Sequence, residues 1–484
     1  MRLVLSGHEY KYAIEQIMLA LFPDERPEYG EGSADELTAE SRMTFGTTYA
    51  QCVTLIRGGG NRFRGVARVK RDGLSDKLIT GRLLQKLIKQ SFYRAAIGML
   101  DSPPVWGSLT GIRPAKIAQN AIEGGKSPEK ILTGEYYVSA ERARLCIDSA
   151  KASLTVKNML QPNDIALYVG IPFCPTRCAY CSFVSNDVGK SFGLIDPFVD
   201  TLLNEIEFMA GVVSERGLRV IAVYIGGGTP TALPDDALSR ILEKLRRSFD
   251  LSDVREYTVE AGRPDTITPE KLKICLENGA TRISVNPQSM SEDVLAAIGR
   301  NHSPQDVLDA VSLVRAAGGM ALNMDIIAGL PRDTYDGFEN TLEIILNLAP
   351  ENVTVHTLSL KKGSRIMLEG AAIPDGETVA KMLDLAHGRL RELEYAPYYL
   401  YRQKFISGGF ENTGWSSRGY EGIYNICMME ELCTVLALGG GGVTKLVLPH
   451  GRIERIFNAK YPREYITNLP EKIRRIREEG KVYD

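Results

Sequence analysis

The most informative stretch of the chain is Tyr168-Val-Gly-Ile-Pro-Phe-Cys-Pro-Thr-Arg-Cys-Ala-Tyr-Cys-Ser-Phe183. It contains Cys174, Cys178 and Cys181 in the spacing C-x3-C-x2-C, directly after an apolar run that predicts a buried strand. Three thiolates on one tight loop could bind three irons of a cubane iron–sulfur cluster, whereas ordinary electron-transfer clusters take four cysteines. Such a site would leave one iron open to a further ligand, as a catalytic zinc site leaves one position open.

Two other interpretations of this cysteine loop are a structural zinc site and a set of buried free thiols. A structural zinc site needs four ligands, and the loop contains no histidine and no further cysteine. The spacing therefore favours a cluster. The remaining cysteines form no C-x-x-C pair, so we interpret them as buried thiols: Cys52, Cys146, Cys275, Cys427 and Cys433.

The composition is that of a soluble globular protein with two or three domains. The 484 residues carry 58 basic and 60 acidic side chains, a net charge of −2. This balance predicts neither a nucleic-acid partner nor an anionic membrane partner. The first residues contain too short an apolar run for a secretory signal, and no later run could span a bilayer. We therefore expect a reduced, cytoplasmic protein rather than a disulfide framework, despite its eight cysteines.

Residues 163–363 alternate between strand-like and helical patterns, which predicts an α/β fold. Helical patterns occur, for instance, at 197–209, 236–249, 269–278 and 338–348. The strand-like runs are 166–171, 220–225, 256–261, 282–286, 321–328 and 352–358. Such alternation implies parallel strands with right-handed crossovers. Six units fit a partial (β/α)6 barrel better than a closed barrel of eight.

The flanking segments predict two further domains. Residues 1–155 suggest an α+β accessory domain, with a hairpin formed by 51–57 and 64–69 and helices after it. We assign no chemistry to this domain. Residues 364–484 suggest a C-terminal α/β cap over the open side of the barrel, with a helix, an aromatic strand and a hairpin.

Glycines and polar residues stand at the predicted strand ends, where parallel barrels carry their chemistry. Gly226-Gly-Gly-Thr-Pro-Thr231 ends the second strand, and its glycines would let backbone N–H groups approach a ligand. Glu260 ends the third strand, Gln288 ends the fourth, and Arg300 follows it. This arrangement predicts a cofactor site at one end of the barrel.

Asp325 lies inside the apolar fifth strand, where a carboxylate is costly unless it is paired or hydrogen-bonded. One interpretation is a structural pair with Arg300 or Arg282. The other is a polar ring that grips the ribose, carboxylate and amino groups of a nucleoside–amino-acid cofactor. The two interpretations are compatible. His356, near the end of the sixth strand, is either a satisfied core histidine or a contact to cofactor or substrate.

The combination of these motifs resembles the oxygen-independent coproporphyrinogen III oxidase family of the radical S-adenosylmethionine (radical SAM) superfamily. The resemblance covers roughly residues 163–445, and the N-terminal domain with 401–404, 422–425 and 437–442 resembles its coproporphyrinogen dehydrogenase-like branch. It implies that Cys174, Cys178 and Cys181 hold a 4Fe–4S cluster, and that Tyr168, Glu260 and Arg300 support catalysis. The residues implied to contact S-adenosylmethionine or support the cluster are Tyr168, Tyr180, Gly227, Gly228, Thr229, Glu260, Gln288, Arg300 and Asp325.

The resemblance also implies a reaction, namely oxidative decarboxylation of two propionates of coproporphyrinogen III to vinyl groups in haem biosynthesis. It implies a tetrapyrrole substrate and an electron donor of the flavodoxin or ferredoxin type, and we expect a monomer. Because propionates are anionic, we expect basic residues near the barrel mouth. The candidates are Arg263, Arg402 and Lys404.

Two departures from the family pattern keep other functions open. The best-studied oxidases carry a further cysteine where this chain has Phe183. The related haem-chaperone branch carries H-N-x-x-Y-W where this chain has Tyr424-Asn-Ile-Cys-Met-Met429. Tyr424, Cys427 or one of the methionines could ligate haem, but burial in the core is the simpler interpretation. The alternatives are a haem- or porphyrin-binding chaperone and a radical SAM enzyme that modifies haem.

Overall fold

The computed structural model describes residues 1–30, 36–74, 77–181, 186–359, 366, 371–403, 409–448 and 452–479. Phe183 and Lys404 therefore lie outside the described residues. The chain divides into two compact units, Met1–Ile147 and Asp148–Asp484. Among the described residues, no helix has both the length and the apolar character needed to cross a membrane.

The first unit is an α+β structure built on a five-stranded sheet. Its helices are α1 (Lys11–Leu21), α2 (Lys77–Ala96) and α3 (Ala115–Glu123). In spatial order the strands are β2 (Glu28–Tyr29), β1 (Arg2–Ser6), β3 (Thr38–Phe45), β4 (Tyr49–Gly58) and β5 (Asn61–Lys70). β4 and β5 form the predicted antiparallel hairpin. Alternate residues of these strands pack with α1 and α2 in one apolar core, to which Ile14 and Phe92 belong.

The second unit contains the predicted barrel of six parallel strands. They are β6 (Asp164–Ile171), β9 (Arg219–Gly227), β10 (Glu256–Glu260), β11 (Arg282–Ser284), β12 (Ala321–Ala328) and β13 (Asn352–Thr357). Neighbours in this order are hydrogen-bonded in parallel. Their side chains are largely buried because helices cover the outer face, which explains the continuous apolar runs in the sequence.

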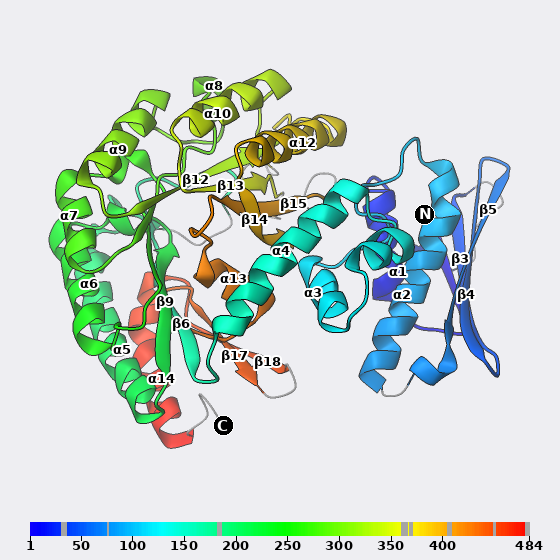
Figure 1. The fold of residues 1–484 in the computed structure, drawn as a ribbon, viewed down its shortest axis with the longest axis horizontal. Helices are drawn as coiled ribbons and strands as arrows, with labels where there is room; N and C mark the ends of the chain where they lie inside the picture. The colour runs from blue at the N-terminus through cyan, green and yellow to red at the C-terminus, as the bar shows by residue number, and fades with distance from the viewer. Residues whose placement is uncertain are drawn as a thin grey trace. The chain divides into compact units, whose positions relative to one another are not determined.

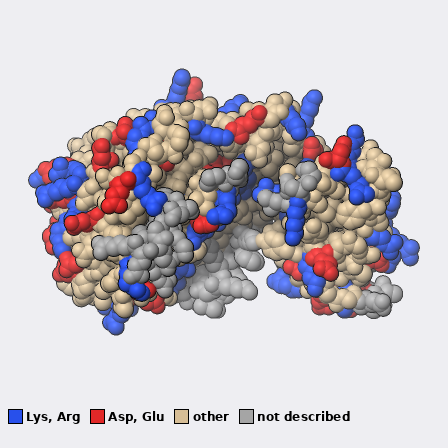
Figure 2. All heavy atoms as spheres, turned by 90° about the horizontal axis from the view of Figure 1, so that it is seen from below, with Lys and Arg blue, Asp and Glu red and all other residues tan. Residues whose placement is uncertain are grey.

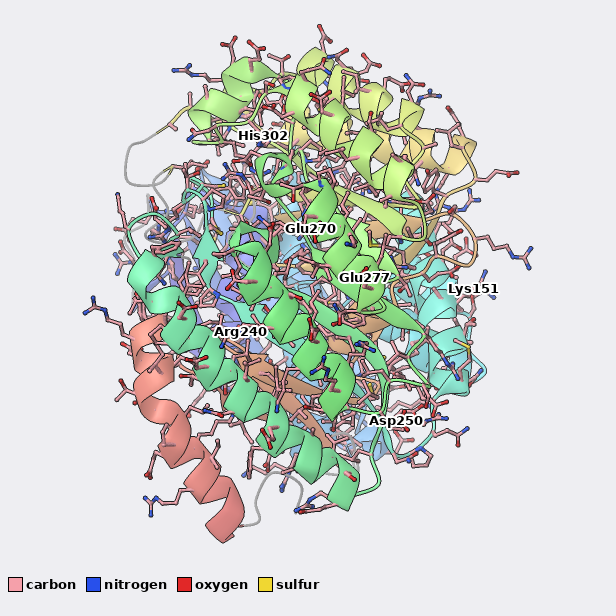
Figure 3. All side chains as sticks on the ribbon, turned by 90° about the vertical axis from the view of Figure 1, so that its left-hand side faces the viewer. Lys151, Arg240, Asp250, Glu270, Glu277 and His302 are labelled. Atoms are coloured by element: carbon pink, nitrogen blue, oxygen red, sulfur yellow. The ribbon has the colours of Figure 1, made fainter. Side chains whose placement is uncertain are left out.

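The connecting helices form a curved outer layer around these strands (Figure 1). They are α5 (Ile195–Glu215), α6 (Asp235–Ser248), α7 (Pro269–Glu277), α8 (Glu292–Ala297), α9 (Pro304–Ala317) and α10 (Tyr335–Asn347). Local sequence fixes the start of α9, where the N-cap residue Ser303 and Asp306 of the first turn form a capping box. Arg240 of α6 and Glu270 and Glu277 of α7 mark the outer side of this layer in Figure 3.

The C-terminal residues extend both edges of the barrel sheet. β15 (Glu411–Ser416) pairs antiparallel with β13, and β14 (Ala396–Arg402) follows it. At the other edge β16 (Thr434–Gly439) pairs parallel with β6. The hairpin of β17 (Val443–Leu448) and β18 (Arg452–Phe457) then completes an eleven-stranded sheet. These strands satisfy the unpaired N–H and C=O groups that an open barrel would leave at its edges.

The described residues also form four further α-helices and one short strand pair. The helices are α4 (Ala140–Met159), α12 (Gly376–Glu392), α13 (Ile423–Glu430) and α14 (Pro462–Glu479). β7 (Phe173–Cys174) and β8 (Asn186–Asp187) form a small parallel pair after β6. Basic and acidic side chains are interspersed over the face shown in Figure 2, as the near-neutral net charge of −2 predicts.

A buried carboxylate fixes the C-terminal helix to the barrel. Glu205 of α5 is 1% exposed and accepts hydrogen bonds from the backbone N–H of Gly439 at 2.8 Å and from Asn458 Nδ2 at 3.2 Å. Lys472 Nζ of α14 lies 2.7 Å from Glu205 Oε1, and the Tyr465 hydroxyl donates to Oε2. One carboxylate therefore holds four donors from the C-terminal segment.

Replacing Glu205 with alanine should lower the free energy of unfolding of the full chain by about 3 kcal/mol, because it removes an acceptor of Lys472 and of three buried donors. Urea unfolding followed by the fluorescence of the two buried tryptophans, Trp106 and Trp415, would measure this loss. Glu207→Gln is the matched control, since Glu207 lies on the same helix but forms an exposed pair with Lys244, and it should change stability little. Wild-type stability in Glu205→Ala would contradict the prediction.

Candidate active site

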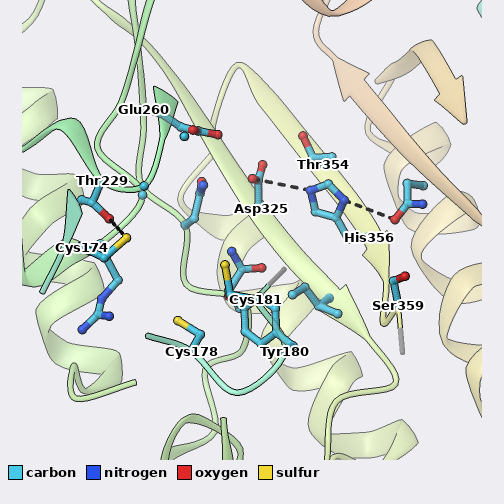
Figure 4. A pocket seen from close by; sticks show the side chains of 18 of the residues that line it. Cys174, Cys178, Tyr180, Cys181, Thr229, Glu260, Asp325, Thr354, His356 and Ser359 are labelled. Atoms are coloured by element: carbon cyan, nitrogen blue, oxygen red, sulfur yellow. Dashed lines mark hydrogen bonds and ion pairs between the residues drawn. The ribbon is translucent and has the colours of Figure 1, made fainter. Parts of the chain in front are cut away.

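A cavity of about 620 Å3 opens at the end of the barrel where the parallel strands terminate (Figure 4). This volume is within the range of small-molecule and cofactor sites. The candidate site residues that line it are Tyr168, Cys174, Cys178, Tyr180, Cys181, Gly227, Gly228, Thr229, Glu260, Gln288, Arg300 and Asp325. The fold thus brings together residues that are more than 150 positions apart in the sequence. Their individual roles stay predictions.

The three motif cysteines surround one side of this cavity and are partly exposed, whereas the other five cysteines are buried. The loop is tight, since the N–H of Cys181 donates to the carbonyl of Cys178 at 3.1 Å. Within the described residues, no three His, Cys, Asp or Glu side chains converge where a single ion could be held. Separate thiols around a shared space are what a cubane cluster with three protein-bound irons requires.

The glycine turn after β9 packs directly on the cysteine loop. A Cβ atom on Gly228 would lie 2.3 Å from the carbonyl oxygen of Phe173 and 2.8 Å from that of Ile171, so only glycine fits. The N–H groups of Gly228 and Thr229 donate to these same carbonyls, each at 2.7 Å. The expectation that the turn offers its N–H groups to a ligand is therefore wrong for these two. The turn braces the cysteine loop instead.

Asp325 does not pair with either arginine considered from the sequence. It accepts a hydrogen bond from Asn323 Nδ2 at 2.9 Å, and its Oδ2 lies 3.6 Å from His356 Nε2. Arg282 instead forms a buried ion pair with Glu256 at 2.8 Å. The structural pairing of Asp325 with Arg300 or Arg282 is therefore wrong. The reason is that β12 and β13 are neighbours, which places Asp325 beside His356.

The two carboxyl groups of the cavity differ in their protonation. Burial and the negative charge of Asp325 raise the pKa of Glu260 to about 7, against the hydrogen bonds from Tyr224 and from the N–H of Gly227. Burial also acts to raise the pKa of Asp325, but His356 and Asn323 outweigh it, so this pKa lies below its ordinary value. The Asp325 carboxylate in turn outweighs burial at His356 and raises the imidazole pKa. An ionised Asp325 carboxylate thus lies in the same cavity as a Glu260 carboxyl whose pKa is about 7.

Arg300 links the cysteine loop to the barrel. Its Nη2 donates to the Tyr180 hydroxyl at 3.1 Å, and its Nη1 donates to the carbonyl oxygens of Gly262, at 3.3 Å, and Asn286. Tyr180 lies between Cys178 and Cys181 in the sequence. Because the guanidinium group is buried and bonded to three separate segments, it holds the loop in a fixed position relative to the strand ends.

The cavity wall also contains buried polar atoms without a partner among the described residues. Among them are Asn286 Oδ1, Gln288 Oε1 and Arg300 Nε. Gln288 has a φ of 67° and is tied to β12, since its N–H donates to the Asp325 carbonyl at 3.0 Å. Strained backbone and unpartnered polar groups are typical of ligand sites. Together with the thiols and carboxyls, they fit a cluster and a nucleoside–amino-acid cofactor.

The basic residues differ from those expected at the barrel mouth. Arg263 lines the cavity, but Arg402 donates to the carbonyl oxygen of Gly409 at 2.8 Å and does not line it. The expectation for Arg402 is therefore wrong, because side chains alternate along β14, and Tyr401 and Gln403 take the face that lines the cavity. Sequence reasoning missed Lys460, which follows β18 and lines the cavity. No motif surrounds Lys460, so the sequence carried no signal for it.

Aromatic residues that the sequence analysis did not assign to the site complete the wall. Tyr224, Tyr399 and Tyr401 line the cavity. The ring of Tyr224 stacks on that of Tyr424 with centroids 4.5 Å apart. Tyr424 is only 4% exposed and Cys427 is fully buried, and both belong to one apolar cluster. The interpretation of these two residues as core is confirmed.

Comparisons with known proteins agree with this architecture. The Radical SAM superfamily matches residues 168–345. The oxygen-independent coproporphyrinogen-III oxidase-like protein HemZ of Bacillus subtilis is 38% identical over 369 residues, covering 74% of each chain. The heme chaperone HemW of Escherichia coli is 27% identical over 308 residues, covering 64% of this chain and 77% of that protein.

The fold is also found among solved structures. The Escherichia coli coproporphyrinogen III oxidase HemN, a radical SAM enzyme, has a TM-score of 0.53 at 21% identity, covering 67% of this chain and 73% of that one. The cofactors of the superfamily are a 4Fe–4S cluster and S-adenosylmethionine. The similarity to HemZ extends over about three quarters of both proteins, well beyond the matched superfamily segment. The chain therefore belongs to the oxygen-independent coproporphyrinogen-III oxidase-like family of the radical SAM superfamily.

Proposed function

We propose that the protein catalyses the oxidative decarboxylation of propionate side chains of coproporphyrinogen III to vinyl groups. The observation that carries the proposal is the single cavity that joins the cysteine loop to Glu260, Asp325 and His356, in a relative of a coproporphyrinogen-III oxidase-like protein. Each propionate would lose one hydrogen atom, one electron and carbon dioxide. The hydrogen atom would pass to the cofactor radical, and the electron to an external one-electron acceptor.

The residues of the chain would hold and orient the reactants. With one electron from a flavodoxin- or ferredoxin-type donor, the cluster and S-adenosylmethionine supply a 5′-deoxyadenosyl radical that abstracts hydrogen. Cys174, Cys178 and Cys181 would hold the cluster, while Glu260 and Asp325, with the other predicted contacts, would hold S-adenosylmethionine. The tyrosine wall would pack against the macrocycle and exclude water, which protects a radical from quenching.

Isotope transfer tests the proposal directly. Protein reconstituted anaerobically would be given reductant, S-adenosylmethionine and coproporphyrinogen III carrying deuterium on the propionate β-carbons. We expect deuterium in 5′-deoxyadenosine and a tetrapyrrole product that has lost the mass of carbon dioxide. A reaction without reductant is the control and should give neither product.

Two results would replace the proposal with an alternative. Tight haem binding without transfer of deuterium, while the cluster is reduced, would favour a haem-chaperone function such as that named for HemW. A methylated or ring-opened haem product would favour a haem-modifying enzyme. Product masses and deuterium content separate these outcomes in a single experiment.

A further inference from the structure

The cavity contains few cations for an anionic substrate. Among the described residues, the basic side chains that line it are Arg263, Arg300, His356 and Lys460. Arg263 is already bound to Asp265, with Nε 3.1 Å from Oδ1, and it donates to Thr176 Oγ1 at 2.9 Å. Arg300 is bonded to the Tyr180 hydroxyl and to two carbonyl oxygens. The terminal nitrogens of both guanidinium groups are therefore bonded to protein groups, and the unpartnered Nε of Arg300 is buried.

Both ring nitrogens of His356 also face oxygen atoms of the protein. Asn412 Oδ1 accepts the backbone N–H of Thr357 at 3.0 Å, which fixes the amide so that this oxygen faces His356 Nδ1 at 3.3 Å. Asp325 Oδ2 faces the other ring nitrogen at 3.6 Å. Both nitrogens thus face acceptors, and a doubly protonated ring satisfies both. The charge of this imidazolium is balanced by Asp325.

Lys460 differs from these three residues. It is exposed, and no hydrogen bond or ion pair joins its ammonium group to another residue in the part of the chain that the structure describes. An ammonium group has three donors and a full charge, which suits a carboxylate ligand. Of the basic side chains that line the described cavity wall, it alone has its charge available for a substrate.

The backbone beside Lys460 is held in place. The N–H of Asn458 donates to the Gly442 carbonyl at 2.9 Å, and the N–H of Gly441 donates to the Ala459 carbonyl at 2.9 Å. The Asn458 side chain is buried and donates to Glu205 and to the Gly439 carbonyl, the latter at 2.8 Å. The segment before Lys460 is thereby fixed against the glycine turn whose residues 440 and 441 also line the cavity. Only the lysine side chain must be ordered on binding, which limits the entropic cost.

We propose that Lys460 binds a carboxylate of the anionic tetrapyrrole substrate at the edge of the cavity. The inference rests on the proposed function and names the residue that recognises the substrate's negative charge. S-adenosylmethionine also carries a carboxylate, so both ligands offer the same chemical group to Lys460. The experiment must therefore measure the two ligands separately.

The test uses Lys460→Gln, which removes the charge, Lys460→Arg, which keeps it, and Arg463→Gln as matched control. Arg463 is exposed and lies three positions further along the chain, and it does not line the cavity. Coproporphyrin III would be titrated into the reconstituted protein and followed by absorbance, with its tetramethyl ester as the uncharged comparison. S-adenosylmethionine affinity, substrate-free S-adenosylmethionine cleavage and KM for coproporphyrinogen III would be measured in parallel.

We expect Lys460→Gln to weaken coproporphyrin III binding and to raise KM by about fivefold or more, the scale of one partly exposed charged hydrogen bond. Lys460→Arg should stay near the wild type, as should Arg463→Gln. Binding of the ester, affinity for S-adenosylmethionine and its substrate-free cleavage should not change in any variant. This pattern assigns the lost interaction to a substrate carboxylate.

Other outcomes overturn the inference. Wild-type binding and KM in Lys460→Gln would show that the lysine is only a solvated surface charge. Equal losses in Lys460→Gln and Arg463→Gln would show a general effect of net charge. A loss confined to S-adenosylmethionine affinity would assign Lys460 to the cofactor instead. If the wild-type protein cleaves S-adenosylmethionine but neither binds nor converts the tetrapyrrole, the proposed function fails, and this inference with it.

Discussion

A variant in which Cys174, Cys178 and Cys181 are all replaced with alanine is expected to bind no iron–sulfur cluster and to cleave no S-adenosylmethionine. Among the described cysteines only these three line the cavity, and the other five are buried elsewhere. Each would supply the thiolate for one iron, so no protein ligand would remain in the loop. Anaerobic reconstitution of the wild-type protein should give about four iron and four sulfide ions per chain, as a cubane cluster requires.

The control for this experiment is Cys275→Ala, which removes a buried thiol of α7 and should keep the cluster. Iron and sulfide analysis, together with the visible absorbance of the cluster, would compare the three proteins. Two results would contradict the prediction. One is a triple variant that retains iron and sulfide, and the other is a wild-type protein that holds a single zinc ion in place of a cluster.

Asp325→Asn should keep the cluster but weaken S-adenosylmethionine binding by on the order of tenfold or more, the scale of a hydrogen bond to a charged group. The carboxylate lines the cavity and is held ionised by His356 and Asn323. The substitution keeps the shape of the side chain and removes its charge, so the cationic cofactor loses an electrostatic partner. Equilibrium dialysis of S-adenosylmethionine against the reconstituted variant would measure the change.

Glu256→Gln provides the comparison for Asp325→Asn. Glu256 is also a buried carboxylate, 3% exposed, and it pairs with Arg282 at 2.8 Å, but it does not line the cavity. We expect it to lower stability while leaving S-adenosylmethionine affinity close to that of the wild type. If Asp325→Asn behaved in the same way, with lower stability and unchanged affinity, its carboxylate would be structural.

Several features of the fold follow directly from local sequence. The alternation of apolar runs with helical patterns predicted the six parallel strands, and the structure confirms each of them within a few residues. β11 ends at Ser284, two residues before the predicted end at Asn286. The chain returns to β12 at Gln288, which forms an isolated parallel bridge with Ile326 and has a left-handed backbone conformation with a φ of 67°. Such a conformation is uncommon for a residue other than glycine.

The grouping of candidate site residues also followed from the sequence. Parallel barrels carry their sites at the C-terminal ends of the strands, so residues that end successive strands are expected to lie close together. The partners of individual side chains did not follow. Asp325 faces His356 because of the register between β12 and β13, which sequence spacing does not reveal. Arg402 was expected at the cavity, but the course of β14 directs it to Gly409. The division at residue 363 between barrel and cap stays a prediction.

By itself the sequence determined the cysteine spacing, the glycine turn and the order of strands and helices. These features depend on residues close together in the chain, where backbone geometry and hydrophobic periodicity act locally. Only the tertiary structure decided that Gly228 packs on Phe173, that Asp325 pairs with His356, and that Lys460 reaches the cavity. These contacts join residues from about 30 to nearly 300 positions apart. The first two arise from the pairing of β6 with β9 and of β12 with β13. Lys460 reaches the cavity because β16 pairs with β6 and the buried Glu205 binds Asn458.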